Sequence, residues 1–169
     1  MDIDQKNVRE FMQKAGQATP DVLTIPDEET RVLRVKILLE EVFEYADAMG
    51  VGIAARAAGD KLGVLLNDDT VEFAIKGDVD LVEVADAIAD VDYINNGNAI
   101  AMGIDMEPVK IEVQRSNMSK FIDGHRRDDG KWVKGPSYSP ANVAGELVTQ
   151  FDGDQLSEAV IESLRSHLS

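Results

Sequence analysis

Hydrophobic residues recur every three or four positions in five stretches of the chain, which is the spacing of amphipathic helices. Helix-start residues such as Pro26, Asp78 and Pro108 stand before or within the first turns of three stretches. The pattern predicts helices over about residues 4–15, 26–49, 79–103, 105–121 and 154–168. The sequence therefore predicts an all-α fold, an antiparallel bundle of four or five helices in a single domain, residues 1–169.

Three parts of this pattern give more detailed expectations. In the first helix, Val8, Phe11 and Met12 are expected to face inward. The last helix has an unbroken apolar stripe, which is typical of a packing or oligomerisation helix. Between residues 51 and 76 the pattern is weaker and is compatible with a short helical turn over residues 53–58 and a small hairpin around residues 67–69.

Five carboxylates interrupt the apolar stripes of two of these helices. Glu40, Glu41 and Glu44 lie on the helix at about 26–49, and Asp86 and Asp90 lie on the helix at about 79–103. With a turn of about 100° per residue, each set falls on the apolar side of its helix. Buried charges are costly unless they are paired or bind a metal, so two facing acidic stripes indicate a cation between them.

The kind of cation follows from the ligand atoms. Hard carboxylate oxygens suit magnesium, manganese or calcium. Magnesium is usually held by a few carboxylates together with substrate phosphates, which points to a nucleotide or another phosphorylated substrate. An acidic helix run taken by itself is more often a solvated surface, and the two stripes together favour the metal site.

Composition limits the classes of protein that remain. The chain has 169 residues, 44% of them hydrophobic, and a formal charge of −15, which suits a globular domain and opposes binding to nucleic acid. The absence of cysteine excludes disulfides and thiolate chemistry. The N-terminal residues do not resemble a secretory leader, and no apolar run is long enough to span a membrane, so a cytoplasmic location is expected.

One segment, at about residues 110–140, is basic although the chain as a whole is acidic. Seven basic and four acidic residues lie between Lys110 and Lys134. A basic segment in so acidic a chain has a simple use if it holds the phosphates that the metal also binds. Plain balancing of surface charge is the alternative.

The acidic run Glu40-Glu41-x-x-Glu44, followed one helix later by Asp90-Val-Asp-Tyr93-Ile, resembles the all-α nucleoside triphosphate pyrophosphohydrolases of the MazG-like superfamily. The segments 115–120 and 129–134 are similar to its bacterial and phage-like branch, which includes phosphoribosyl-ATP pyrophosphohydrolase-like proteins. The chain departs from the superfamily pattern at Ala87, where a Glu is usual. Either Asp86 or Glu83 would have to replace that ligand.

The resemblance implies hydrolysis of a (deoxy)nucleoside triphosphate between the α and β phosphates, giving a monophosphate and pyrophosphate. It implies magnesium, with manganese as the alternative metal, and a homodimer or homotetramer. In this reading, Glu40 and Glu41 are the catalytic carboxylates and Glu40 orients the attacking water. The implied metal ligands are Glu41, Glu44, Asp86 and Asp90. The implied substrate-binding residues are Asn117, Lys120, Arg127, Lys131 and Lys134.

Two other classes were weighed against this one. A di-iron carboxylate bundle needs Glu-x-x-His, and the residues three before His125 and His167 are Ile122 and Leu164. An acidic interaction protein, such as a nucleic-acid mimic, would use the −15 charge to occupy a basic partner and would point its carboxylates outward. The second class remains the alternative to the enzyme.

Overall fold

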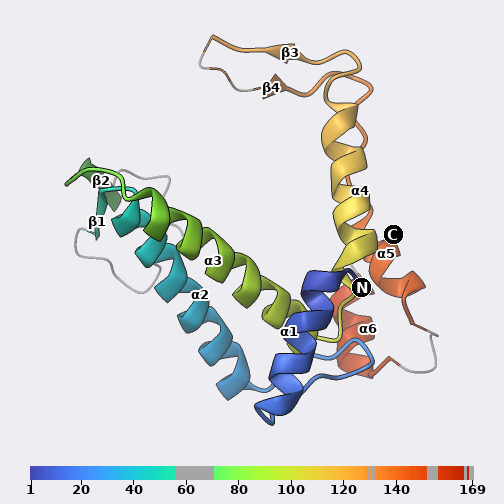
Figure 1. The fold of residues 1–169 in the computed structure, drawn as a ribbon. Coiled ribbons are helices and arrows are strands. Elements are labelled where there is room, and N and C mark those ends of the chain that lie inside the picture. The colour runs from blue at the N-terminus through green and yellow to red at the C-terminus, as the bar shows by residue number, and fades with distance from the viewer. Residues whose placement is uncertain (56–70, 129, 131, 152–155, 166, 168–169) are drawn as a thin grey trace. The chain divides into compact units, whose positions relative to one another are not determined.

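The computed structural model describes residues 1–55, 71–128, 130, 132–151, 156–165 and 167. The described residues form six helices and two short antiparallel strand pairs (Figure 1). The helices are α1 (Ile3–Lys14), α2 (Glu28–Ala48), α3 (Leu81–Ala101), α4 (Met106–Ser119), α5 (Val143–Thr149) and α6 (Glu158–Arg165). The prediction of a mostly helical fold is confirmed, with six helices in place of four or five.

The starts of α2, α3 and α4 are capped by aspartates, and two of them differ from the prediction: Pro26 precedes α2 and is not in its first turn, and the cap of α3 is not Asp78. The side chain of Asp27 accepts from Thr30 N and begins α2, and Asp105 accepts from Glu107 N and begins α4. At α3 the cap is Asp80, because its Oδ1 accepts from the backbone of Val82 and Glu83 at 3.0 and 3.3 Å. The prediction of Asp78 at this position is wrong.

Of the helical turn predicted for residues 53–58, residues 53–55 lie in a strand, so this part of the prediction is wrong, and residues 56–58 lie outside the described residues. Strand β1 (Val51–Ala55) pairs antiparallel with β2 (Val71–Ile75), in a register that joins Val51 to Ile75 and Ala55 to Val71. Their β-branched and aromatic residues suit a strand. The predicted hairpin at residues 67–69 lies outside the described residues.

Two further elements occupy regions where the sequence predicts no helix or strand. Strands β3 (His125–Arg126) and β4 (Trp132–Val133) form a second antiparallel pair. Helix α5 begins at Asn142, whose side chain accepts from Gly145 N at 3.0 Å. The C-terminal helix is shorter than predicted, since α6 covers Glu158–Arg165.

The described chain divides into two compact units, and each is considered by itself. Unit 1 comprises residues 1–26 and 96–169, and unit 2 comprises residues 27–95. The single domain indicated by the sequence stays a prediction. No helix of the described residues is long and apolar enough to cross a membrane.

Unit 1 contains the buried hydrophobic clusters. One cluster joins α1 to the end of α3 through Val8, Met12, Ile100 and Ala101. The other joins Leu23 to Val160 and Leu164 of α6, in agreement with the predicted packing role of the last helix. Phe11 is 54% exposed, so its predicted core position is wrong. It lies about 60° from Val8 on the side away from Met12, at the edge of the buried face.

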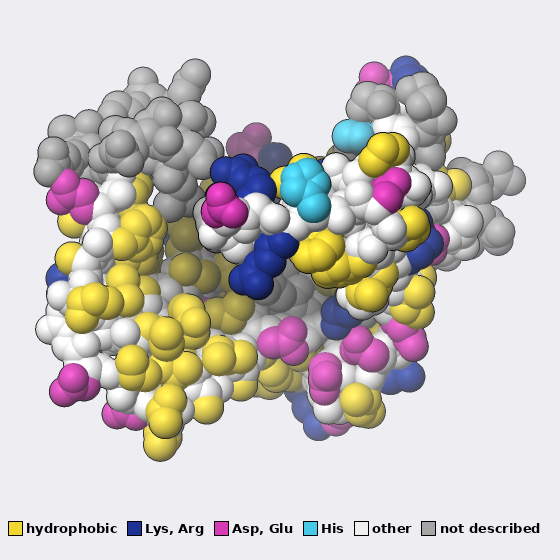
Figure 2. Space-filling model, turned by 90° about the horizontal axis from the view of Figure 1, so that it is seen from above, with side chains coloured by type: hydrophobic (Ala, Val, Ile, Leu, Met, Phe, Trp, Pro, Cys, Tyr) yellow, Lys and Arg dark blue, Asp and Glu magenta, His cyan; other side chains and the backbone are white. Residues whose placement is uncertain are grey.

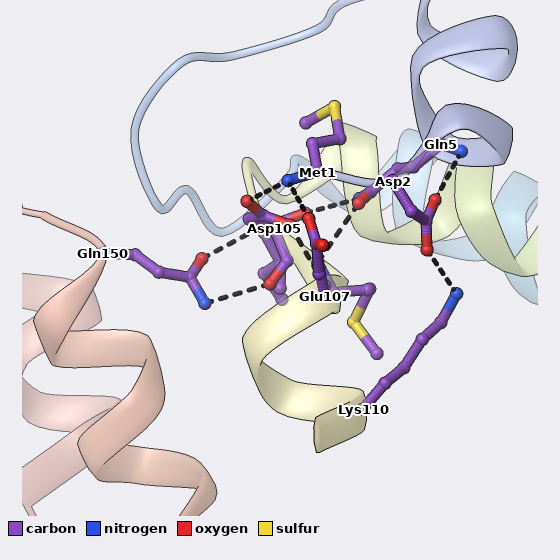
Figure 3. Close-up of polar contacts among 9 residues, drawn as sticks. Met1, Asp2, Gln5, Asp105, Glu107, Lys110 and Gln150 are labelled. Atoms are coloured by element: carbon purple, nitrogen blue, oxygen red, sulfur yellow. Dashed lines mark hydrogen bonds and ion pairs between the residues drawn. The ribbon is translucent and has the colours of Figure 1, made fainter. Parts of the chain in front are cut away.

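Gln5 occupies the buried face of α1 that hydrophobic patterning would leave to an apolar residue. Its side chain is completely buried, and its Nε2 donates to Ile104 O at 2.6 Å while its Oε1 accepts from Met106 N at 3.1 Å. Gln150 makes a similar pair of bonds to the backbone of Asp105, both at 2.9 Å (Figure 3). These two amides fix the turn between α3 and α4 by satisfying its backbone groups.

Unit 2 consists of α2, β1, β2 and the first part of α3. No residue of α2 is buried, and Ala87 is the one buried hydrophobic side chain among the described residues of this unit. Many of its large hydrophobic residues are exposed, and the broad group of yellow side chains at the lower left of Figure 2 lies over this unit. Unit 2 therefore presents apolar surface that the described chain does not cover.

Candidate active site

The five carboxylates predicted as catalytic or metal-binding all lie in unit 2, on two neighbouring helices that run in opposite directions (Figure 1). Burial raises the pKa of the Glu41 carboxyl, and the charges of Glu44, Asp90, Glu40 and Asp86 raise it further, in that order. Charges act this way over separations of about a Debye length or less, so both acids of α3 lie within that range of Glu41. The structure thus brings the predicted carboxylates together around Glu41.

Their burial differs from the sequence prediction. Glu41 is half-buried, whereas Glu40, Glu44, Asp86 and Asp90 are exposed. Some of the apolar residues that share these faces are exposed as well, since Leu33 is 53% and Tyr93 is 38% exposed, whereas Ile37 and Ile94 are half-buried. The two helices therefore carry the predicted mixed faces, but no other described element covers them.

The structure also bears on the missing superfamily Glu at Ala87. Ala87 is 5% exposed, so its side chain belongs to the packed side of α3. The charge of Asp86 reaches Glu41, as its effect on the pKa indicates. Glu83, one turn earlier, lines a hollow of about 580 Å³ whose other lining residues are Phe43, Glu44, Asp47, Ala48, Asp78 and Asp80. Of the two replacements that the sequence allows, Asp86 is the one whose charge raises the pKa of Glu41, and Glu83 shares its hollow with Glu44.

The chemistry of these five side chains suits a divalent cation. It offers only carboxylate oxygens, and the mutual repulsion that raises the pKa of Glu41 is the effect that a bound cation relieves. Among the described residues, no three acidic, histidine or cysteine side chains are gathered closely enough to hold a metal as they stand. The exposed carboxylates are the ones with rotamer freedom to close such a site.

Arg34 is a basic residue on this face that the helical analysis of the acidic stripe did not include. It precedes Glu41 by seven residues, which places it about 20° from Glu41 around the axis of α2. Burial lowers the pKa of its guanidinium, although an arginine of this kind stays charged at neutral pH. The acidic face of α2 therefore has a positive charge two turns before Glu41.

The predicted substrate-binding residues lie in unit 1. Lys120 caps the end of α4 and its Nζ donates to Asn117 Oδ1 at 2.7 Å. Lys134 Nζ stands 4.1 Å from the centre of the Tyr138 ring. Arg127 is exposed between β3 and β4, and Lys131 lies outside the described residues. The structure thus joins Asn117 to Lys120 and gives Lys134 a partner that the sequence analysis did not consider.

Trp132 has a structural contact that accounts for its partial burial. Its Nε1 donates to the backbone oxygen of Lys120 at 2.7 Å, and its ring centre lies 4.8 Å from that of Phe121. The indole therefore satisfies a carbonyl at the end of α4 and fixes β4 against that end. This contact holds Lys120 and Lys134 on neighbouring parts of unit 1.

The sequence analysis missed Tyr138 and Ser116. Ser116 is buried on α4, and its Oγ donates to the Tyr138 oxygen at 3.4 Å. The Tyr138 pKa is lowered by hydrogen bonds with Ser116 and Lys134, and the charges of Lys134 and Lys120 lower it further. A signal was present in the sequence, because Glu112, Ser116 and Ser119 are polar residues at helical spacing on one face of α4.

The model of the phosphoribosyl-ATP pyrophosphohydrolase family matches residues 8–117. The match contains all five carboxylates and Asn117, and it ends before Lys120, the β3–β4 pair and Tyr138. None of the curated proteins matches the chain.

Proposed function

The chain belongs to the phosphoribosyl-ATP pyrophosphohydrolase family, whose members hydrolyse phosphoanhydride bonds, and we propose that its own substrate is a nucleoside triphosphate cleaved between the α and β phosphates. This family is part of the MazG-like superfamily, so the resemblance found in the sequence is confirmed. Membership of an enzyme family argues against the alternative of a non-enzymatic acidic binding protein. The products of the proposed reaction are a nucleoside monophosphate and pyrophosphate.

The observation that carries the proposal is the group of four carboxylates around Glu41 on α2 and α3. Glu41, Glu44, Asp86 and Asp90 would hold magnesium. A bound magnesium ion polarises phosphoryl oxygens and lowers the pKa of a coordinated water. Glu40, exposed beside Glu41, would accept the proton of the attacking water, which is the role of a general base.

The basic residues that the resemblance implies as substrate-binding would neutralise phosphate charge. Lys120, Arg127, Lys131 and Lys134 supply positive charge for the departing pyrophosphate, whose negative charge grows as the bond breaks. Asn117 would hydrogen-bond the sugar, base or phosphate. Its bond to Lys120 Nζ restrains both side chains before a substrate arrives.

The test is pyrophosphate release from a panel of canonical and damaged (deoxy)nucleoside triphosphates and phosphoribosyl-ATP, with magnesium, with manganese and with a chelator. We expect metal-dependent release of pyrophosphate and a monophosphate from at least one triphosphate, identified by chromatography. Glu41→Gln should abolish this turnover and leave the folded structure nearly unchanged. Turnover of phosphoribosyl-ATP alone would overturn the proposed substrate, and full activity in Glu41→Gln would remove Glu41 from the site.

The partner proposed for the uncovered face of unit 2 is a second copy of the chain. Hydrophobic residues of α2 alternate at spacings of three and four, which is the seam of a coiled coil: Val32, Val35, Leu39, Val42, Ala46 and Met49. The first four of these are exposed. Monomers rarely expose apolar patches of more than a few hundred Å², and a seam of this kind is self-complementary in a symmetric dimer.

Sedimentation at micromolar concentration tests this proposal. We expect a dimer or a dimer of dimers. A monomer at that concentration would contradict it and would require another cover for the exposed side chains of α2.

A further inference from the structure

Arg34 is a cation on the side of α2 that carries Glu41. It precedes Glu41 by seven residues, which places it about 20° from Glu41 around the helix axis and about 10 Å before it along that axis. The other basic residues of α2 lie farther round the helix, Arg31 at about 80° and Lys36 at about 140° from Glu41. Arg34 is therefore aligned with Glu41 and two turns away from it.

Arg34 is also more restricted than the other cations of α2. It is half-buried, and its Nε atom is inaccessible to solvent. Arg31 and Lys36 are exposed, and Arg31 pairs with Glu28 at 3.7 Å near the start of the helix. A side chain that is already restricted loses less conformational entropy when it binds a ligand. The free energy that burial of its charge costs is offset when an anion binds.

The surroundings of Arg34 give its charge a particular value. In the described part of unit 2, acidic residues outnumber basic ones, so a polyphosphate that approaches the carboxylates is repelled. A bound metal ion neutralises the phosphates that it touches, and a phosphate beyond its reach needs a cation of the protein. Arginine suits this task because its guanidinium stays charged and binds phosphate oxygens in pairs.

The proposed cleavage indicates which phosphate lies beyond the metal. Hydrolysis between the α and β phosphates needs the metal at the oxygens of those two groups. A nucleoside diphosphate offers the same two groups as a triphosphate. Contacts at the scissile bond therefore do not distinguish the two substrates, whereas a cation farther along the same helix can contact the γ phosphate that only the triphosphate carries.

We propose that Arg34 binds the γ phosphate of the substrate and is the residue by which unit 2 selects triphosphates over diphosphates. This inference rests on the proposed function for the position of the scissile bond, and it names the part of the substrate that sets the preference. All the residues that it uses lie in unit 2. It applies equally to a nucleoside triphosphate and to phosphoribosyl-ATP, because both carry three phosphates.

The rival explanation is structural. The aliphatic part of an arginine side chain covers apolar surface, so its loss can destabilise a helix without any effect on a ligand. Arg34→Met keeps an apolar side chain of similar reach and removes the cation. A structural role would lower the melting temperature and the turnover of every substrate, whereas a contact with the γ phosphate affects triphosphates alone.

The experiment compares kcat/KM for the triphosphate and the diphosphate of one nucleoside, with magnesium. We expect the wild type to favour the triphosphate, and Arg34→Met to lower kcat/KM for the triphosphate about tenfold or more, the effect of losing a hydrogen bond between charged groups. Turnover of the diphosphate should stay nearly unchanged. Arg34→Lys should recover part of the preference, because lysine keeps the charge and lacks the paired donors.

Arg31→Met is the matched control, since it makes the same substitution one turn earlier on α2 at an exposed arginine. It should keep the preference of the wild type for the triphosphate. An unchanged preference in Arg34→Met would overturn the inference. Equal losses for both substrates, together with a lower melting temperature, would assign Arg34 a structural role and would also overturn it.

A binding measurement separates this inference from the proposed function. Calorimetry with magnesium compares the triphosphate and diphosphate of adenosine in which a methylene group replaces the oxygen between the α and β phosphates, so that neither is cleaved. If the wild type hydrolyses no triphosphate but binds the triphosphate analogue more tightly in a manner that depends on Arg34, the selection stands and the proposed reaction fails. If triphosphates are hydrolysed and the two analogues bind the wild type equally, the reaction stands and the selection fails.

Discussion

Units 1 and 2 use their hydrophobic and charged residues in opposite ways. Unit 1 buries apolar side chains in two clusters and pairs its polar groups internally, as Gln5 and Gln150 do at the turn before α4. Unit 2 exposes apolar side chains along α2 and gathers like charges around Glu41. The first arrangement stabilises a fold, and the second leaves favourable interactions to be made with something else.

This difference indicates which unit is stabilised by binding partners. Like charges held together cost free energy until a cation arrives, and exposed hydrophobic residues cost free energy until a protein surface covers them. Ligand-binding regions are commonly drawn from the less stable parts of a protein. We therefore expect metal and self-association to stabilise unit 2 and to affect unit 1 much less.

The largest effect should come from the carboxylates of α3. Asp90→Asn removes a charge that acts on Glu41, and we expect kcat to fall by about a hundredfold or more because the metal ligands are incomplete. Steady-state kinetics with magnesium measures this. Asp92→Asn, two residues later and near the opposite side of α3, is the matched control and should keep nearly full activity. Equal losses of kcat in both variants would mean that the substitutions disturb α3 as a whole and do not act through the metal ligands.

The second effect concerns the seam of α2. Leu39→Glu puts a charge at the centre of the exposed apolar stripe, and we expect the dimer dissociation constant to rise by about a hundredfold, since a leucine loses its burial in each copy. Sedimentation over a concentration series measures it. Asp47→Asn changes charge at an exposed position of the same helix that does not flank the seam, and should leave the association state unaltered. An unchanged dimer dissociation constant in Leu39→Glu would show that the seam of α2 does not form the interface.

A smaller effect is expected in unit 1. Gln5→Ala leaves Ile104 O and Met106 N without their buried partners, and we expect a loss of about 1–3 kcal/mol in the free energy of unfolding. Urea denaturation measures the loss. Gln13→Ala, on the same helix but exposed, should change stability by less than about 0.5 kcal/mol. A neutral Gln5→Ala would mean that water replaces the amide at this turn.

The smallest effect should appear only as a pH dependence. The hydrogen bond from Arg115, followed by that from Asn142 N, lowers the pKa of Glu112 from 4.5 to about 2. A carboxyl with a lowered folded-state pKa stabilises the protein above its unfolded pKa, and that contribution is lost as pH falls from about 4.5 toward 2. Unfolding free energies of the wild type and Glu112→Gln should therefore converge over this range. A constant difference between them would show that the ionised state of Glu112 is not responsible.

Local chemistry predicted the helices better than it predicted the strands. Asp27 caps α2 as its position suggests, and Gly50 ends that helix with a φ of 67°, which favours glycine. The choice between Asp78 and Asp80 was open to sequence reasoning, because both precede the same apolar pattern. Strand β1 pairs with residues about twenty positions later, and no local pattern specifies such a partner.

The candidate site, too, could be predicted from the sequence only in part. Helical spacing was sufficient to group Glu41 with Asp90 across two helices, and the raised pKa of Glu41 agrees with that grouping. Their exposure could not be predicted, because it depends on what covers α2 and α3. Tyr138 meets Ser116 across 22 positions of the sequence, so a search for charged residues alone could not find it.

The strap of residues 137–142, which hydrogen-bonds to α4 and to the residues after it, has a consequence for how this protein can change over evolutionary time. Its path is set by hydrogen bonds to backbone atoms, including those of Ser137, Ser139 and Asn142. Substitutions in the strap should therefore be tolerated at most positions, whereas substitutions of Glu112, Ser119 and Asp123 should not. A saturation library would then show a permissive segment with two restricted positions, Tyr138 and Asn142, beside a restrictive helix face.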